Sequence, residues 1–252
     1  MHKKKSSSQW DKVSSWYIGL TDDKGHYFHK QIIFPQLKPL LPKKGSVLDL
    51  ACGQGVLAEY LPTKVDYWGL DISSKLIAHA KKKHKSPNQH FLKQDLSIDF
   101  TLDKTDFDYA FCILAMQDIK DVESLLTNAH KHLAQNGKLI IVLNHPCFRI
   151  PRQSSWDIDR EHKTQQRKIQ RYLSHLDIPI QITPSKGEKS RKTVSHHRPL
   201  FYYFSLLKKT GFVVSDLQEW ISDKKSTGKY AAMENLARKE IPLFLMIEAE
   251  KR

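Results

Sequence analysis

The sequence predicts an α/β domain built around a parallel β-sheet. From residue 46 onward, short apolar runs alternate with stretches of helical periodicity, which is the pattern of successive βα units. A glycine-rich turn follows the first apolar run, as expected where a strand passes into a ligand-binding loop. The 252 residues are 40% hydrophobic, enough for one large globular domain with an appendage.

The predicted elements of the first half follow this alternation closely. Ser73 or Ser74 is placed to cap the second helix, and Asn136-Gly137 provides a left-handed stop between the third helix and the next strand. Strands are expected at residues 47–50, 67–70, 90–93, 109–114 and 138–143, and helices at residues 56–61, 73–83 and 122–133.

The alternation breaks after residue 143. Residues 144–197 are rich in Arg, Lys, His, Gln and Ser, and they contain no further pattern of a parallel strand. One basic helix is predicted between about residues 158 and 176. A long insertion of this kind inside an α/β domain is usually a functional cap or lid.

The alternation resumes after the insertion. A helix is expected over residues 199–209, with Pro199 in its first turn and Gly211 after its end. We expect a domain over residues 46–252 that contains the insertion, preceded by a cap segment at residues 1–45 whose aromatic side chains pack over the domain. Two more strands are expected at residues 212–217 and 243–249.

The positive charge of the chain lies mostly outside the predicted sheet. There are 41 Lys and Arg against 27 Asp and Glu, a net charge of +14 that is often associated with nucleic-acid binding. Residues 49–150, however, hold 12 basic and 12 acidic residues, and 12 of the 14 excess charges lie before residue 49 or between residues 151 and 200. The basic excess therefore bears on what the protein acts on, not on the glycine-rich loop.

Cysteine usage and hydropathy indicate the compartment. Cys52, Cys112 and Cys147 are too few and too widely spaced for a disulfide framework or a zinc site, so neither is expected. The amino-terminal basic run has no apolar segment behind it, and no stretch approaches the roughly 18 apolar residues of a membrane span. We expect a soluble, cytoplasmic protein that binds no metal.

The segment VLDLACGQGVLAEYL is the most informative in the chain. Its G-x-G-x-x-A motif at residues 53–58 fits the fingerprint of dinucleotide-binding loops, in which glycines let the backbone approach a ligand. Asp49, Asp71 and Asp95 end or follow three successive predicted strands. Because parallel strands end at the same edge of a sheet, these three carboxylates should lie side by side.

Three carboxylates at this edge favour a cationic ligand. Asp49 would repel a pyrophosphate by about 1 kcal/mol or more at this short range. S-adenosylmethionine has no phosphate, and it offers an ammonium, a sulfonium, two ribose hydroxyls and an adenine amino group. On this interpretation Asp49 supports the ammonium, Asp71 accepts the ribose hydroxyls, and Asp95 accepts the adenine amino group with the Leu96 amide nearby.

Several stretches together resemble the class I S-adenosylmethionine-dependent methyltransferases, namely DLACGQG, GLDIS, QDL, FDYAFCILAMQDI and LAQNGKLII. The resemblance is strong over residues 46–143, looser beyond them, and nearest to the group that includes quinone-biosynthesis and natural-product enzymes. It implies a Rossmann-like, seven-stranded, mostly parallel sheet with helices on both faces, an antiparallel last strand and the basic insertion as a cap after the fifth strand. It also implies an enzyme that transfers a methyl group to an acceptor at the carboxyl edge.

Two positions depart from the family pattern. Ala51 stands where many members have glycine, and Gln117 stands where related small-molecule enzymes often have histidine, so we assign Gln117 no catalytic role. Tyr17 is expected to lie over the cofactor. The residues expected to bind S-adenosylmethionine are Tyr17, Asp49, Ala51, Cys52, Gly53, Gly55, Asp71, Ile72, Asp95, Leu96 and Cys112.

The acceptor should be bound where the chain leaves the sheet for the insertion and where it returns. An oxygen or carbon acceptor also has a proton to lose, and histidine is the usual proton acceptor. His145 and His197 are therefore the predicted catalytic residues. The residues expected to bind the acceptor are Tyr27, His29, Asn144, Arg149, Trp156, His196 and Arg198.

The run Asn144-His145-Pro146-Cys147 allows two further interpretations. It resembles the Asn-Pro-Pro-aromatic motif of amino-group nucleic-acid methyltransferases only poorly, because it follows the fifth strand and lacks the second proline and the aromatic residue. A Pro-Cys pair also occurs where a cysteine attacks a pyrimidine, but no second cysteine stands in a matching motif. Neither interpretation is favoured.

Two classes of acceptor compete. The first is a small molecule, with the insertion acting as a lid. The second is an RNA or an acidic protein, bound by Lys3, Lys4, Lys5 and the basic insertion. No aromatic and basic RNA-binding motif accompanies the positive charge, so the small molecule is favoured. A catalytically inactive binding protein is disfavoured because the loop and all three acids are intact.

Overall fold

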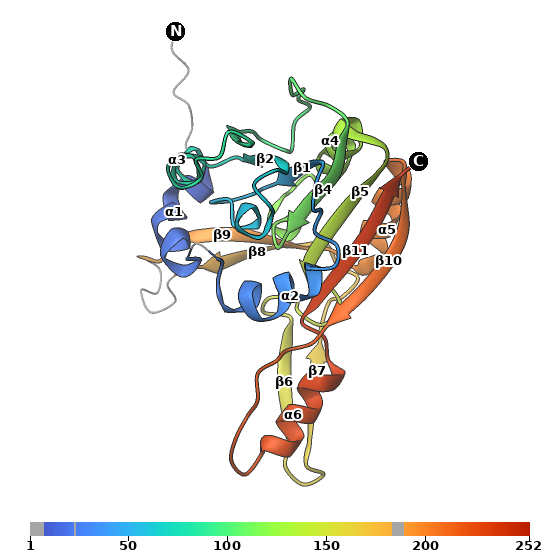
Figure 1. Cartoon of the computed structure of the whole chain (residues 1–252). Coiled ribbons are helices and arrows are strands. Elements are labelled where there is room, and N and C mark those ends of the chain that lie inside the picture. Colours follow the sequence, from blue (N-terminus) through green and yellow to red (C-terminus); the bar gives the residue numbers. More distant parts are fainter. Residues whose placement is uncertain (1–7, 23, 183–188) are drawn as a thin grey trace.

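A seven-stranded mixed sheet forms the centre of the protein (Figure 1). The structure is a computed structural model that describes residues 8–22, 24–182 and 189–252. The strands lie in the order β10-β11-β5-β4-β1-β2-β3, and the last of them in the chain, β11, runs antiparallel to both of its neighbours. The strands are β1 (Ser46–Leu50), β2 (Asp66–Asp71), β3 (Gln89–Lys93), β4 (Phe107–Ile113), β5 (Leu133–Asn144), β10 (Phe212–Trp220) and β11 (Phe244–Lys251). This confirms the predicted fold class.

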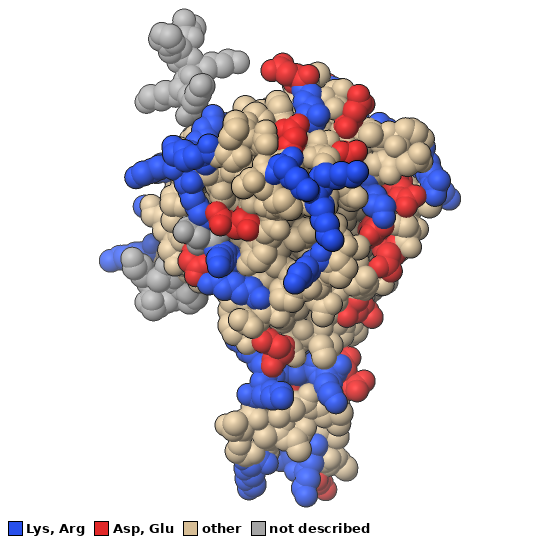
Figure 2. Space-filling model, in the orientation of Figure 1, with Lys and Arg blue, Asp and Glu red and all other residues tan. Residues whose placement is uncertain are grey.

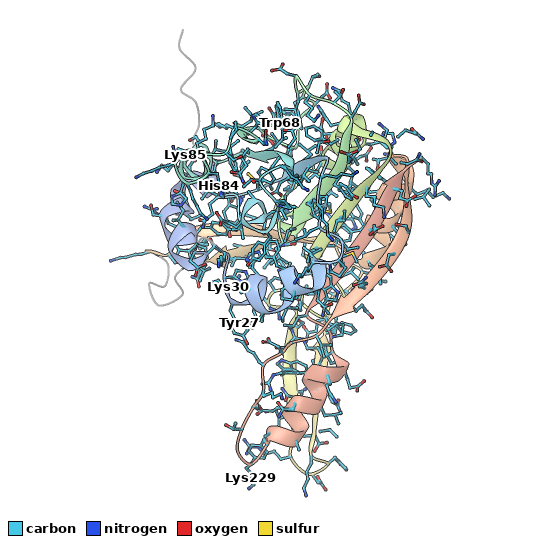
Figure 3. All side chains as sticks on the ribbon, in the orientation of Figure 1. Tyr27, Lys30, Trp68, His84, Lys85 and Lys229 are labelled. Carbon is cyan, nitrogen blue, oxygen red and sulfur yellow. The ribbon has the colours of Figure 1, made fainter. Side chains whose placement is uncertain are left out.

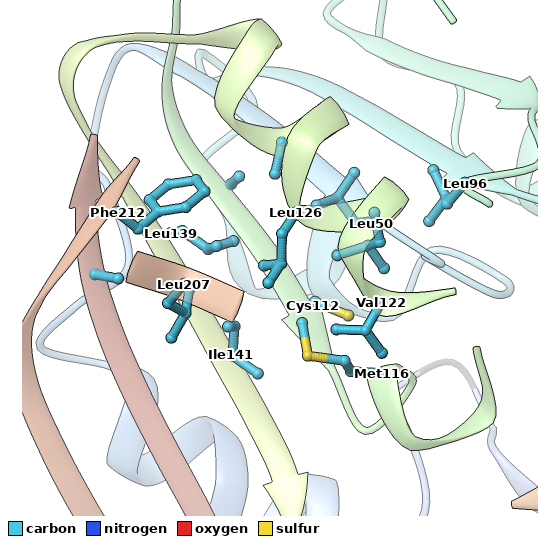
Figure 4. Close-up of a cluster of buried hydrophobic side chains, with 14 of the residues drawn as sticks. Leu50, Leu96, Cys112, Met116, Val122, Leu126, Leu139, Ile141, Leu207 and Phe212 are labelled. Carbon is cyan, nitrogen blue, oxygen red and sulfur yellow. The ribbon is translucent and has the colours of Figure 1, made fainter. Parts of the chain in front are cut away.

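Alternate residues of the central strands belong to two hydrophobic clusters, one on each face of the sheet. In β1, Leu48 and Leu50 join the first cluster and Val47 joins the second, as the period of two in a strand requires. Leu126 of helix α4 (Val122–His132) and Leu207 of helix α5 (Leu200–Lys209) complete the first cluster (Figure 4). The second is covered by α3 (Ser74–Lys83) and the short segments η1 (His29–Ile33), α2 (Phe34–Leu37) and η2 (Leu57–Tyr60).

The helices begin where the sequence places capping residues. Ser73 accepts a hydrogen bond from the Leu76 backbone N–H at 3.2 Å, and Asp121 accepts one from the Ser124 N–H at 2.9 Å. Both helices begin and end within one residue of the predicted bounds. The helix predicted at residues 56–61 is only the 3₁₀ turn η2.

The amino-terminal segment is anchored to the sheet domain through Asp11. Helix α1 (Gln9–Leu20) starts with a reciprocal capping box between Ser8 and Asp11. The other carboxylate oxygen of Asp11 accepts hydrogen bonds from the Ser73 hydroxyl at 2.7 Å and the Lys75 N–H at 3.1 Å. One buried carboxylate thus ties the start of α1 to the start of α3.

The prediction of a basic helix between about residues 158 and 176 is wrong. The insertion folds into two antiparallel hairpins, β6–β7 and β8–β9. Residues of β7 alternate between more and less buried, a period of two that the abundance of helix-favouring Arg, Lys and Gln obscured. Positive φ angles of 52° at Lys163 and 53° at Arg171 turn the chain at the ends of β7. The strands are β6 (Ser154–Asp159), β7 (Thr164–Ile169), β8 (Leu176–Gln181) and β9 (Lys192–His197).

The two hairpins lie in different places. The β6–β7 hairpin and helix α6 (Ala231–Glu240) pack together and extend away from the sheet, with Lys229 near the far end of this extension (Figures 1 and 3). The β8–β9 hairpin instead contacts α1 and the short helix η3 (Met116–Asp118) that follows β4. No helix in the described part of the chain is both long and apolar enough to cross a membrane.

Candidate active site

A cavity of about 760 Å³ lies at the carboxyl edge of the sheet. Its floor consists of residues at or just beyond the carboxyl ends of β1 to β5, as expected for a ligand site in an α/β sheet. Helix α1 covers one side of it with Trp10 and Tyr17, and the β8–β9 hairpin covers another with Pro179 and Val194. Both covering segments come from parts of the chain that precede or interrupt the sheet domain.

The glycine-rich loop enters the cavity in an unusual backbone conformation. Ala51, Gly53 and Gly55 all have positive φ, at 62°, 58° and 82°. The Cys52 N–H donates to the Leu70 carbonyl at 2.9 Å, which holds the loop against β2. Gln54 is buried and its amide donates to the carbonyl oxygens of Thr21 and Asp22, at 3.1 Å for Asp22. The loop is therefore fixed both to the sheet and to the end of α1.

Asp71 organises the loop as well as facing the cavity. One carboxylate oxygen accepts the Gly53 N–H at 2.9 Å and the other accepts the Ser73 N–H at 2.8 Å. Burial raises the pKa of Asp71 to about 6, although these two amide bonds act in the opposite direction. The end of β2, the glycine loop and the start of α3 thus meet at one carboxylate.

Two further acids, Asp49 and Asp118, have raised pKa values in this part of the protein. Asp49 lies behind the loop instead of in the cavity wall, and it accepts the Tyr67 hydroxyl at 2.6 Å. Asp118, at the end of η3, does line the cavity. Burial raises the pKa of each to about 7. Together with Asp71, these acids raise the pKa of the buried Tyr17 hydroxyl, after burial itself.

The predicted cofactor residues divide into a wall and a supporting layer. Tyr17 lies against Gly53, where a Cβ atom would come within 3.3 Å of the tyrosine ring. The residues that line the cavity are Tyr17, Ala51, Gly53, Asp71, Ile72, Asp95 and Leu96. Those that do not are Asp49, Cys52, Gly55 and Cys112, which lie in the packing beneath the loop.

The side chain of Asp95, just after β3, is oriented by Ser97. This side chain accepts hydrogen bonds from the Ser97 N–H at 2.9 Å and the Ser97 hydroxyl at 2.6 Å. Only one of its two carboxylate oxygens is engaged in these bonds, so the other has its acceptor capacity left.

The predicted catalytic histidines are not in the cavity wall. His145 is buried with both ring nitrogens engaged, by Glu219 at 2.7 Å and by the Cys147 N–H at 3.2 Å. His197 contacts the Tyr172 carbonyl at 2.8 Å. Because His197 lies in strand β9, its side chain must point away from the face that His196 presents to the cavity.

His196 is the histidine that the β8–β9 hairpin brings to the cavity. Its Nδ1 lies 2.7 Å from the carboxylate of Asp177, its register partner in β8, and both residues line the cavity. The hydrogen bond from His196 lowers the pKa of Asp177. A carboxylate on one ring nitrogen fixes the ring orientation and leaves Nε2 to accept a proton. The sequence analysis missed Asp177 because only the strand register brings it to His196.

The predicted acceptor residues are also divided by the structure. His29, Asn144, Arg149 and His196 line the cavity. Tyr27 is exposed and donates to Asp223 at 2.8 Å, outside the cavity (Figure 3). Trp156 lies on the extension beneath the Arg167 guanidinium. Arg198 donates hydrogen bonds from Nη2 to the carbonyl oxygens of Ile119 and Lys120.

Gln117 and Asp118 also line the cavity, and sequence reasoning assigned neither of them a role. The Gln117 amide donates to the Leu114 carbonyl at 2.6 Å, and its oxygen is buried without a protein partner. Their position directly after β4, the fourth strand of the parallel set, is a signal that could have identified them.

Comparison with known proteins agrees with this geometry. Residues 48–139 match the family model described as a methyltransferase domain. The chain is 26% identical to an S-adenosylmethionine-dependent methyltransferase of Mesorhizobium loti, with a TM-score of 0.66 and coverage of 86% of this chain and 97% of that one. These findings identify a class I S-adenosylmethionine-dependent methyltransferase domain. Enzymes of this class use S-adenosylmethionine as their cofactor.

The chain is also similar in sequence to two curated relatives. Over 107 residues the chain is 30% identical to an uncharacterized methyltransferase of Schizosaccharomyces pombe. The aligned residues are 38% of this chain and 37% of the relative. Over 165 residues it is 26% identical to a phthiotriol/phenolphthiotriol dimycocerosates methyltransferase of Mycobacterium tuberculosis, covering 63% of this chain and 58% of the relative. The chain thus spans less than two thirds of the length of either relative.

The residues present fit a cationic cofactor. The wall holds the buried Asp71 and the partly buried Asp118, and the buried Asp49 lies behind the loop. A ligand with an ammonium and a sulfonium would stabilise their ionised forms, which burial alone disfavours. S-adenosylmethionine supplies an electrophilic methyl group on its positively charged sulfur.

Cofactor binding should depend on pH. A bound cation favours the ionised carboxyls, so binding lowers their pKa values and releases protons wherever the free protein is protonated. With pKa values of about 7 for Asp49 and about 6 for Asp71, affinity should fall as the pH is lowered from 7 to 5, by up to about tenfold per unit for each carboxyl. Calorimetry at pH 5, 6 and 7 measures this.

The neutral sulfur of S-adenosylhomocysteine makes it the matched control for this titration. Its affinity should fall less steeply over the same range, because only the ammonium remains to interact with the acids. Equal affinity of S-adenosylmethionine at all three pH values would contradict the electrostatic account.

Proposed function

We propose that the protein transfers a methyl group from S-adenosylmethionine to a small-molecule acceptor bound in the same cavity. The observation that carries this proposal is the covering of the cavity by α1 and the β8–β9 hairpin, which come from the amino-terminal segment and the insertion. A single ligand commonly occupies a pocket of ~300–1,000 Å³. A cavity of about 760 Å³ suits the cofactor together with a compact acceptor.

In this proposal the acidic side of the cavity holds the cofactor. Asp71 accepts the ribose hydroxyls, Asp95 accepts the adenine amino group, and Tyr17 covers the bound molecule. Asp49 acts from behind the loop on the methionine ammonium. Helix α1 of the cap segment (residues 1–45) and the β8–β9 hairpin of the insertion (residues 144–197) then cover the site on the domain at residues 46–252.

The chemistry left to the protein is positioning and, for a hydroxyl acceptor, proton removal. The oxygen attacks the methyl carbon in line with the departing sulfur, which leaves as the neutral thioether of S-adenosylhomocysteine. The hydroxyl proton passes to Nε2 of His196, whose ring is held at Nδ1 by Asp177. This assignment replaces the predicted roles of His145 and His197, whose side chains lie outside the cavity wall.

An RNA or an acidic protein is the competing acceptor, and the net charge of +14 is the observation in its favour. Figure 2 shows Lys and Arg spread over the visible face with Asp and Glu among them. The three cysteines are unpaired, which suits the cytoplasm as the site of either reaction.

Methyl transfer from labelled S-adenosylmethionine into a fractionated cell extract tests the proposal. We expect label in the small-molecule fraction, and we expect His196→Asn to reduce its transfer by about 10²-fold or more while leaving cofactor affinity unchanged. Label confined to RNA or protein, together with salt-dependent retention of RNA on filters, would instead establish the competing acceptor.

A further inference from the structure

The basic residue Arg149 of the cavity wall carries a charge that no acidic residue neutralises. Its side chain has neither an ion pair nor a hydrogen bond within the part of the chain that the structure describes. Burial lowers the pKa of Arg149, and the charge of Arg167 lowers it further. A partly buried guanidinium is costly unless a ligand or a protein group pairs with it.

The neighbouring Arg167, in contrast, has hydrogen-bond partners within the protein. Its Nε donates to the Phe148 carbonyl at 2.8 Å and its Nη2 donates to the Ser154 hydroxyl at 2.6 Å. Its guanidinium also stacks over the ring of Trp156, at 5.1 Å from the ring centre. Arg167 does not line the cavity, but its charge acts on Arg149.

The cavity wall that includes Arg149 also includes aromatic rings. Arg149 follows β5 by five residues, and Asn144 at the end of β5 pairs with Phe244 at the start of β11. The Phe244 ring lies 5.5 Å from the Phe28 ring, and both phenylalanines line the cavity. This part of the wall suits a flat apolar body.

Charges of both signs line the cavity. Asp71 and Asp118 act on the pKa of Tyr17, whereas among the described residues Arg167 is the charge that acts on the pKa of Arg149. The acidic side suits a cationic cofactor, and the side of Arg149 suits an anion. A guanidinium presents two parallel N–H groups that match the two oxygens of a carboxylate.

We propose that Arg149 binds a carboxylate on the methyl acceptor, and that the acceptor is an aromatic or similarly apolar carboxylic acid. The inference rests on the proposed function, since it assigns the acceptor side of the same cavity. A single free guanidinium suits the one charge of a carboxylate better than the two charges of a phosphate monoester. The carboxylate then orients the acceptor so that its reacting group faces the acidic, cofactor side.

Ligand-observed NMR on protein saturated with S-adenosylhomocysteine tests this assignment. The probes are benzoate, 4-hydroxybenzoate and trans-cinnamate, each compared with its neutral amide. We expect at least one carboxylate to bind and its amide to bind at least tenfold more weakly. Arg149→Gln should weaken binding of the carboxylate at least tenfold, and Arg149→Lys should retain part of the affinity for the carboxylate.

The matched control is Arg160→Gln, which removes the same charge from an exposed residue next to β6, outside the cavity wall. It should bind the carboxylate as the wild type does, and calorimetry should show unchanged affinity for S-adenosylhomocysteine in all variants. Equal binding of acid and amide, no binding of any of the three acids, or an Arg149→Gln variant that binds like the wild type would each overturn the inference. Failure of the wild type to bind S-adenosylhomocysteine would count against the proposed function instead.

Discussion

Replacing Asp71 with alanine is expected to abolish measurable binding of S-adenosylmethionine. The substitution removes the acceptor that we propose for both ribose hydroxyls, and hydrogen bonds to a charged group contribute about 1.5–3 kcal/mol each. It also leaves the Gly53 and Ser73 N–H groups without their carboxylate, so the loop loses its fixed shape. The expected loss is about 3 kcal/mol or more, a factor of at least ~100 in affinity by calorimetry.

Asp99→Ala is the control for the change of charge. Asp99 lies after β3 outside the cavity wall, with an 81% exposed side chain paired to Lys131. Its loss should leave cofactor affinity within a factor of two, since exposed ion pairs contribute little. An Asp71→Ala protein that remains folded and binds the cofactor with unchanged affinity would refute the ribose assignment.

Gly55→Ala is expected to cause the largest loss of stability among single changes in the loop. Gly55 has φ of 82°, where an L side chain is strained, and a Cβ atom there would lie 2.7 Å from a ring carbon of Phe91. Phe91 is buried in the second hydrophobic cluster, so it has little room to move. Backbone strain of about 1 kcal/mol and overpacking of about 1–3 kcal/mol should lower the free energy of unfolding by about 2–4 kcal/mol.

Gly228→Ala separates these two contributions. Gly228 has φ of 88°, but no heavy atom lies within 4 Å of the Cβ position. Chemical denaturation should therefore show only the strain, about 1 kcal/mol. If both variants lost the same free energy, the close contact with Phe91 would have no energetic role. Gly55→Ala should also weaken cofactor binding, because the displaced loop contains Gly53.

Local sequence patterns sufficed for the sheet domain. The strands β1 to β5 and the helices after β2 and β4 were recognised because short apolar runs alternate with stretches of helical periodicity, and a capping serine precedes α3. The acidic side of the cavity was equally accessible, since carboxyl ends of parallel strands converge wherever such a sheet forms. Asp71 and Asp95 therefore line the cavity as the spacing indicated.

The acceptor side depended on contacts between distant residues. The composition of residues 158–176 suggested a helix, yet β7 is held by pairing with β6 and by packing against α6, some seventy residues later in the chain. His196 and Asp177 meet only because β8 and β9 pair in one particular register. A shift of one residue would have presented His197 instead.

The sequence by itself thus determined the fold class, the glycine-rich loop and the acids of the cofactor side, because these depend on residues close together in the chain. Tertiary structure alone decided which histidine faces the cavity, which arginine is left without a partner and which acid joins the wall after β4. Those outcomes depend on strand register and on competition among hydrogen-bond partners. His145 and His197 form hydrogen bonds with residues that no local pattern places beside them, and Arg198 Nη2 does the same.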